Sequence, residues 1–195
     1  MPMLIKSKIN AYILAGGLSR RFGSNKAIYK IDGVTFLDKI FTTLQSNFTN
    51  IFTIGKEPYS EKMEFVSDFT DQQAPIVGII TALRHTTSSW NFIISVDMPY
   101  ITSDIVNLLQ KEIIGIDNNI IIPSVNGRIL PLFGLYHQNC LVHFEKAYLA
   151  KNYTLMNVVL SLRPTVVNLS QYNIKLKNVN TLEQLKKNQI NIIIK

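Results

Sequence analysis

Short apolar runs alternate along the chain with segments in which apolar residues recur at helical spacing. Apolar runs of about four to eight residues, bounded by turn-forming residues, are typical of buried strands. The clearest run, residues 90–96 (WNFIISV), is aromatic and β-branched, as expected of a central parallel strand covered on both faces. Strands are predicted at residues 10–15, 51–54, 65–66, 90–96, 120–122, 130–136 and 165–169.

Helices are predicted where the apolar residues recur every three or four positions. The first follows Thr35, a candidate N-cap, with Asp38 three residues further on in the manner of a capping box. A second capping box, at Thr181, predicts a short helix to about Lys187. The remaining helices are predicted at residues 79–84, from Thr102 or Ser103 to residue 109, and at residues 141–150 and 155–162.

Two dipeptides predict tight turns, and one apolar run has no clear place. Asp32-Gly33 marks a turn, and Asn126-Gly127 is the strongest hairpin signal in the chain, with residues 130–136 as its return strand. The terminal run at residues 190–194 is either an added edge strand or a contact with another subunit.

This order of elements favours an α/β fold, in which a mostly parallel sheet lies between two layers of helices. We expect a single Rossmann-like domain over residues 1–195, because no repeat, low-complexity tract or linker divides the chain. Ligands of such folds bind outside the carboxyl ends of the strands. The glycine-rich loop after the first strand, Asp68 and Asp97 all follow predicted strands, so we expect them to face one crevice.

Composition limits the class of protein and of partner. The chain is 47% hydrophobic and 17% charged, which indicates a globular protein. No apolar run approaches the roughly 18 residues of a membrane span, and the start lacks a secretory core, so we expect a cytoplasmic protein. The net charge of +7 suits anionic ligands, but no dense basic run indicates nucleic acid or a membrane as partner. The single cysteine, Cys140, is expected to be a core residue.

The loop at residues 13–26 (ILAGGLSRRFGSNK) has the composition of a phosphate-binding loop. Gly16 and Gly17 lack a Cβ, so their backbone can turn sharply and bring N–H groups close to an anion. Arg20, Arg21 and Lys26 add positive charge. The order of residues does not match a Walker A loop or the dinucleotide fingerprint.

Asp97 is the candidate metal ligand. A carboxylate at the end of a buried strand is costly unless it is paired, hydrogen-bonded or bound to a cation. Mg²⁺ prefers oxygen ligands, and it usually takes one or two carboxylates together with substrate phosphates. A role as the cap of the next helix is the alternative, but Asp97 stands too far ahead of Ser103.

Four segments resemble the molybdenum cofactor guanylyltransferases and, more broadly, the transferases that make nucleotide sugars and cytidylyl conjugates. The signature L-A-G-G-x-S-x-R-x-G-x-x-K is matched position for position by residues 14–26, and Val96-Asp97-Met98-Pro99 resembles the family's D-x-P motif. Asp68 precedes residues 74–78 (APIVG), which resemble G-P-L-A-G with alanine for the first glycine; Asp71 competes for its role. Residues 178–183 (NVNTLE) resemble N-V-N-T-P-E, which favours guanylyl over cytidylyl transfer.

The resemblance implies a fold of the nucleotide-diphospho-sugar transferase type, with a nucleotide-binding part at about residues 1–100 and an acceptor-binding part at about 101–195. It implies Mg²⁺-dependent transfer of GMP from GTP to the phosphate of molybdopterin, with or without molybdenum, and release of pyrophosphate. Transient contact with other cofactor-biosynthesis proteins or with recipient molybdoenzymes would follow. The alternatives are a cytidylyl- or sugar-phosphate nucleotidyltransferase and, in another class, a non-catalytic basic protein that binds nucleotides or RNA.

The same resemblance assigns residues to roles. Catalytic roles fall to Arg21, Lys26 and Asp97, with Asp97 also as the metal ligand. Acceptor binding falls to Asn178 and Asn180, for which a plain loop and helix cap is an equal alternative. Nucleotide binding falls to Leu14, Ala15, Gly16, Gly17, Lys26, Asp68, Gly78 and Asp97.

Overall fold

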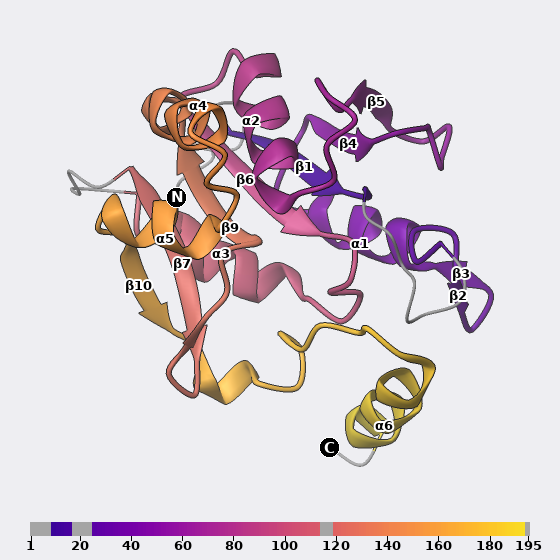
Figure 1. Cartoon of the computed structure of the whole chain (residues 1–195). Helices are drawn as coiled ribbons and strands as arrows, with labels where there is room; N and C mark the ends of the chain where they lie inside the picture. Colours follow the sequence, from indigo (N-terminus) through magenta and orange to yellow (C-terminus); the bar gives the residue numbers. More distant parts are fainter. Residues whose placement is uncertain (1–8, 17–24, 114–118, 194–195) are drawn as a thin grey trace.

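Strand β1 (Ile9–Leu14) lies in the middle of the sheet and is buried along its whole length. The structure, a computed structural model, describes residues 9–16, 25–113 and 119–193 (Figure 1). The other elements are β2 (Lys30–Ile31), β3 (Val34–Thr35), α1 (Phe36–Leu44), β4 (Ile51–Gly55), β5 (Glu64–Ser67), α2 (Pro75–His85), β6 (Trp90–Ser95), α3 (Ser103–Lys111), β7 (Ile120–Val125), β8 (Arg128–Ile129), β9 (Phe133–His137), α4 (Leu141–Leu149), α5 (Leu155–Ser161), β10 (Thr165–Asn168) and α6 (Leu182–Ile193).

The sheet is mostly parallel, as predicted. Its order is β10-β7-β9-β6-β1-β4-β5, and β8 pairs with β7. Strand β1 is parallel to β4 and β6, so that Tyr12 lies beside Phe52 on one side and Ile93 on the other. Strand β9 is antiparallel to both of its neighbours, β6 and β7. The carboxyl ends of β1, β4, β5 and β6 therefore meet at one edge of the sheet.

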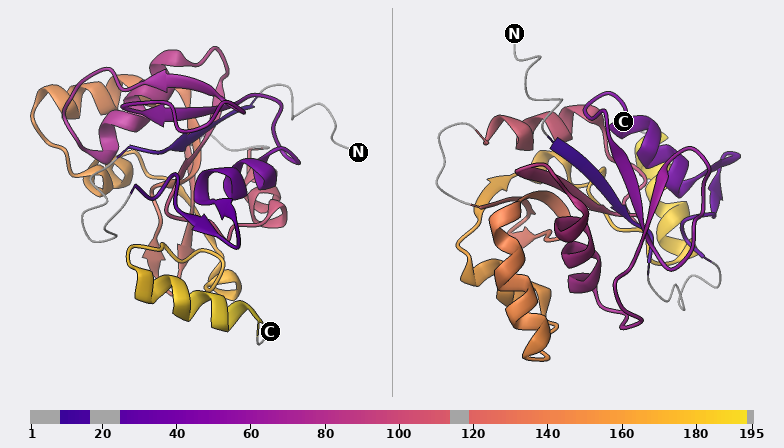
Figure 2. Two further views of the ribbon diagram at one scale, coloured as in Figure 1. Left: turned by 90° about the vertical axis from the view of Figure 1, so that its right-hand side faces the viewer. Right: turned by 90° about the horizontal axis from the view of Figure 1, so that it is seen from above.

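Helices cover both faces of the sheet because side chains of a strand point alternately to the two sides. In β1, Ala11 and Ile13 belong to the core that α1 and α3 cover, whereas Tyr12 and Leu14 belong to the core under α2, α4 and α5. Figure 2 shows these helix layers on opposite sides of the sheet. The three-layer α/β/α prediction is confirmed. None of the described helices is long and apolar enough to cross a membrane.

Local turn and cap chemistry accounts for several boundaries. Thr35 accepts a hydrogen bond from the Asp38 N–H at 3.0 Å and caps α1, as predicted. Asn126 and Gly127 have φ angles of 49° and 78° and join β7 to β8. Positive φ at both central residues gives the turn the twist that a two-residue hairpin needs, so the hairpin prediction is confirmed.

Three predicted elements have the wrong extent. Helix α2 begins at Pro75, ahead of the predicted residue 79, since proline fits the first turn of a helix. The return strand of the hairpin is β8, ahead of the predicted residues 130–136, and that predicted range becomes a strand only at Phe133, in β9, after Pro131, which has no N–H to donate. Helix α6 runs to Ile193, past the predicted end at Lys187, because no glycine or proline stops it. The prediction of an edge strand at residues 190–194 is therefore wrong.

Candidate functional site

The segments that the sequence predicts to share a crevice do meet at the carboxyl edge of the sheet. The Ala15 N–H donates to the Ile54 carbonyl at 2.8 Å, which fixes the exit of β1 beside the end of β4. The Asp68 N–H donates to the Gly55 carbonyl at 2.9 Å, so Asp68 follows the same edge. Asp97 comes directly after β6, the other neighbour of β1. These three segments therefore lie at one edge of the sheet.

Lys26, Asp97, Asn178 and Asn180 form one polar cluster. The Lys26 ammonium lies 4.0 Å from Asp97 Oδ2 and donates to Asn180 Oδ1 at 2.6 Å. Asn178 Nδ2 donates to Asp97 Oδ2 at 3.2 Å, and the Val179 N–H donates to the Asp97 carbonyl at 2.7 Å. Two segments that are remote in sequence, at Lys26 and at residues 178–180, thus converge on Asp97.

The Asp97 side chain is largely buried, with 14% of its surface exposed. Burial raises the pKa of the Asp97 carboxyl, while the side chains of Ser95, Lys26 and Asn178 work in the opposite direction. Its Oδ1 atom is buried and has no hydrogen-bond partner among the residues that the structure describes. Such an oxygen is costly to leave unpaired. A carboxylate oxygen is a kind of ligand that Mg²⁺ takes, usually together with substrate phosphates, so the chemistry of Asp97 fits this ion.

A cavity of about 260 Å³ opens at the same edge of the sheet, and its lining residues do not include the four residues of this cluster. Four of the predicted nucleotide-binding residues line it: Leu14, Gly16, Asp68 and Gly78. Ser95, at the end of β6, lines the same cavity, and Asp97 stands two residues after it in the chain. Ala15, also predicted to bind nucleotide, is buried and does not line this cavity.

The glycines at this cavity permit close packing. A Cβ on Gly78 would lie 3.0 Å from Leu14 Cδ2, so the first turns of α2 pack closely against the end of β1. A Cβ on Gly16 would lie 3.3 Å from Asp68 Oδ2, so the carboxylate lies against the loop backbone. Ala74, which replaces the family's glycine, has φ of −146°, an extended conformation that alanine adopts without strain.

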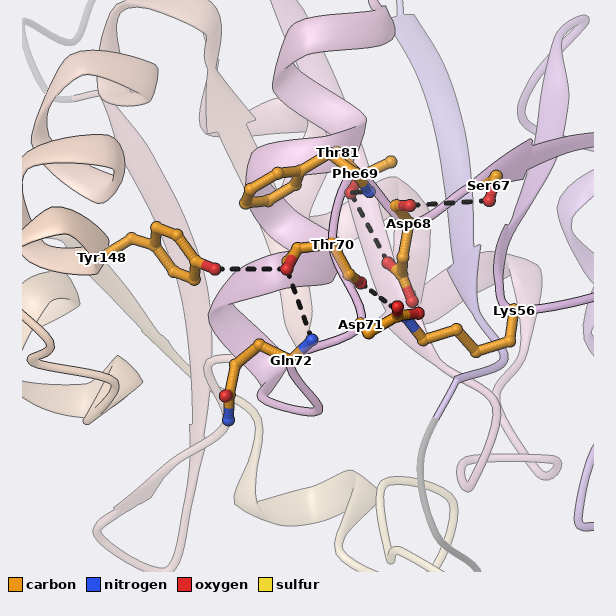
Figure 3. A network of polar contacts seen from close by, with 9 residues as sticks. All are labelled: Lys56, Ser67, Asp68, Phe69, Thr70, Asp71, Gln72, Thr81 and Tyr148. Carbon is orange, nitrogen blue, oxygen red and sulfur yellow. Dashed lines mark hydrogen bonds and ion pairs between the residues drawn. The ribbon is translucent and has the colours of Figure 1, made fainter.

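Asp68 and Asp71, the two competitors for one role, lie in different surroundings (Figure 3). Asp68 lines the cavity, and burial raises the pKa of its carboxyl, with Lys56 and Thr81 opposing that rise. The Asp71 side chain is fully exposed and pairs with Lys56 at 3.1 Å. The geometry therefore favours Asp68 over Asp71 as a ligand-binding residue.

Sequence reasoning missed Lys56 and Ser95, both of which line the cavity. Their positions in the sequence could have indicated them, because Lys56 comes just after the carboxyl end of β4 and Ser95 stands at that of β6. Ligands of this fold bind at these ends. Gly17 and Arg21, predicted to bind phosphate and to act in catalysis, lie outside the described residues, and so does Arg20.

Comparisons with known proteins agree with this geometry. A family model described as the MobA-like NTP transferase domain matches residues 11–165. A probable molybdenum cofactor guanylyltransferase from Natranaerobius thermophilus is 29% identical over 192 residues, covering 91% of this chain and 93% of that protein.

Solved structures share the fold. That of molybdopterin-guanine dinucleotide biosynthesis protein A from Archaeoglobus fulgidus has a TM-score of 0.81 at 20% identity, covering 95% of this chain and 100% of that one. The 4-diphosphocytidyl-2C-methyl-D-erythritolsynthase from Anaerococcus prevotii has a TM-score of 0.73 at 12% identity, covering 98% and 99%. Because one of these names specifies guanine and the other a cytidyl group, the fold alone does not choose the base.

Proposed function

The chain belongs to the family of MobA-like NTP transferase domains and is a nucleotidyltransferase, and on this premise we propose that it is a Mg²⁺-dependent molybdenum cofactor guanylyltransferase. It transfers GMP from GTP to the terminal phosphate of molybdopterin, with or without molybdenum, and releases pyrophosphate. The observation that supports this most is the convergence of Lys26, Asp97, Asn178 and Asn180 at the same edge of the sheet as the cavity of Leu14 and Asp68.

The nucleotide and the acceptor would bind on opposite sides of the cluster of Lys26, Asp97, Asn178 and Asn180. The nucleotide-binding part, at about residues 1–100, provides the cavity, Lys26 and Asp97. The acceptor-binding part, at about residues 101–195, provides Asn178 and Asn180, which contact Asp97 and Lys26. An acceptor phosphate held by these amides would lie next to the α-phosphate of a bound nucleotide.

The transfer forms a bond between an acceptor phosphate oxygen and the α-phosphorus of GTP, and breaks the bond from that phosphorus to the bridging oxygen of pyrophosphate. A phosphate monoester with a second pKa of about 6 offers an ionised oxygen at neutral pH, so no general base is needed. The protein's contribution is alignment and cancellation of charge.

Each residue of the cluster has a defined part. The Gly16 backbone lies against the phosphate path, and the Lys26 ammonium offsets the charge that grows on pyrophosphate. Arg21 would assist in the same way. Asp97, through the unpaired Oδ1, would hold Mg²⁺ together with phosphate oxygens. When bound, the ion neutralises charge on the triphosphate and polarises it for attack.

The proposal is tested with purified protein, each nucleoside triphosphate in turn, and molybdopterin. We expect pyrophosphate release and a guanylylated product with GTP only, dependent on Mg²⁺. Turnover with CTP or with a sugar phosphate instead would replace the proposal with the corresponding transferase. RNA binding that weakens steeply with salt, without turnover, would indicate the non-catalytic alternative.

A further inference from the structure

Lys56 lines the cavity that the proposed function assigns to the nucleoside. It follows directly after β4 and lines the same cavity as Asp68 and Leu14. Its side chain is 34% exposed, so the ammonium is at the border between cavity and solvent. The inference below rests on the proposed function, because it takes this cavity as the nucleoside pocket.

The Lys56 ammonium holds the segment that forms the outer wall of the cavity. It donates to the Thr70 carbonyl at 2.5 Å and to Asp71 Oδ1 at 3.1 Å (Figure 3). Gln72, next along this segment, lines the cavity. An ammonium has three N–H donors. Among the described residues two of them have these partners, so the third is not engaged by this segment.

A carboxylate lies close to this donor. Asp68 lines the cavity with Lys56, whose charge opposes the effect of burial on the pKa of Asp68. Asp68 Oδ2 faces the Gly16 backbone, while Oδ1 is 3.5 Å from the Thr81 hydroxyl, a long contact. One pocket thus presents a strong donor and a strong acceptor to whatever base it holds.

We propose that Lys56 is a specificity-determining residue that, together with Asp68, selects a base whose edge carries a carbonyl oxygen next to an N–H group. Guanine has this edge, with O6 beside N1–H: the ammonium donates to the oxygen and the carboxylate accepts from the N–H. Adenine and cytosine have the opposite order, an amino group beside an unprotonated ring nitrogen. Each would set donor against donor and acceptor against acceptor, which excludes a wrong ligand more strongly than a lost contact does.

The alternative role for Lys56 is mechanical, in that it merely holds Thr70 and Asp71 in place. The two roles are separated by the Asp71→Asn variant, which weakens the hold on the segment and leaves the ammonium at the cavity. A matched control is Lys62→Met, since Lys62 also pairs with an aspartate, Asp38, at 3.0 Å, but does not line the cavity.

The experiment measures dissociation constants by calorimetry for GTP, ITP, CTP and the triphosphate of 2-aminopurine riboside. 2-Aminopurine keeps the amino group of guanine but lacks O6 and the N1–H. For the wild-type protein we expect GTP and ITP to bind more tightly than the other two. Lys56→Met should lower the preference for GTP over the 2-aminopurine nucleotide by about tenfold or more, the size of a lost charged hydrogen bond. Lys56→Arg should retain most of it, and Asp71→Asn and Lys62→Met should leave it unchanged.

Three results would overturn the proposal. The first is a Lys56→Met variant that keeps the preference for GTP over the 2-aminopurine nucleotide, and the second is an Asp71→Asn variant that loses as much of this preference as Lys56→Met. The third is a wild-type protein that binds the 2-aminopurine nucleotide or CTP as tightly as GTP. This last measurement decides the matter even if Lys56→Met fails to fold. A wild-type protein that transfers GMP while Lys56→Met keeps its preference refutes this inference alone, whereas a protein that binds no nucleoside triphosphate refutes the proposed function with it.

Discussion

Asn178 donates a hydrogen bond to the Asp97 carboxylate across 3.2 Å, although 81 residues separate the two in the chain. The contact brings the C-terminal segment onto the end of β6, where it completes the surroundings of the carboxylate. Lys26 and Asn178 both approach the Oδ2 atom of Asp97, and its Oδ1 atom is left without a hydrogen-bond partner among the described residues.

The Asp97→Asn variant should lose most of its turnover, by about a hundredfold or more, because the amide cannot hold a cation or match the charge of Lys26. A pyrophosphate-release assay at saturating GTP and Mg²⁺ measures the change. Asp104→Asn, an equal change of charge at an exposed position of α3, is the matched control and should retain normal turnover. Normal turnover in Asp97→Asn would remove Asp97 from the site.

The same variant should be more stable than the wild-type protein at neutral pH without metal. Burial raises the pKa of Asp97 above its ordinary value of 3.8, so the folded state binds the proton more tightly than the unfolded chain. The stability from this group is therefore greatest below the unfolded pKa and is lost as the pH rises through the folded pKa.

Urea unfolding at pH 7 and pH 4, with and without Mg²⁺, tests this prediction. We expect a gain in the free energy of unfolding of Asp97→Asn at pH 7. It should shrink at pH 4, where the wild-type carboxyl is nearer to being protonated. A variant that is equally destabilised at both pH values would contradict the assigned electrostatics.

Lys26→Met should lower kcat by about a hundredfold with a smaller effect on the KM for GTP, since the charge it cancels grows during the transfer. The variant also loses the hydrogen bond to Asn180, but the long methionine side chain preserves the packing. Steady-state kinetics measures kcat and the KM for GTP separately. Lys30→Met, at an exposed position in β2, serves as the control. An increase in the KM for GTP with an unchanged kcat would show that Lys26 contributes to substrate binding and not to stabilisation of the transition state.

Asn180→Ala should weaken the binding of the acceptor more than the binding of the nucleotide. The Asn180 side chain contacts Lys26 and does not line the nucleoside cavity, so we expect a higher KM for molybdopterin and a nearly unchanged dissociation constant for GTP. Asn152→Ala, in the exposed connection between α4 and α5, is the control. Weakened GTP binding with a normal acceptor KM would move Asn180 to the nucleotide side.

Gly134→Ala should destabilise the fold without any change at the site. A Cβ there would lie 2.6 Å from the Ile121 carbonyl oxygen and 2.5 Å from Ile122 Cγ2, and the strand backbone cannot move aside. Overpacking of this kind costs about 1–3 kcal/mol. Urea unfolding should show a larger loss than in Gly33→Ala, where φ is +81° but a Cβ would meet nothing within 4 Å. Equal losses would contradict the prediction.

The sequence predicted what depends on local chemistry. The apolar run of β6, the Thr35 cap and the Asn126-Gly127 turn are all determined by residues close together in the chain, and each is confirmed. The carboxyl-end rule was enough to bring Asp68 and Asp97 to one edge of the sheet.

The sequence did not predict what depends on non-local pairing. The place of β9 between β6 and β7 is decided by contacts across the sheet, and periodicity carries no information on partners. Lys56 was missed for a related reason: a lysine after a strand is usually a solvated side chain, and only the cavity and Asp68 beside it show otherwise.

The single reversed strand within the main order of the sheet has a geometric consequence. Because β9 lies between β6 and β7, these two parallel strands stand two strand spacings apart, or about 10 Å. The reversed strand thus acts as a spacer at the rim of the sheet. Under the proposed function, two reactants would have room to lie side by side there, one near the end of β6 and the other near the end of β7.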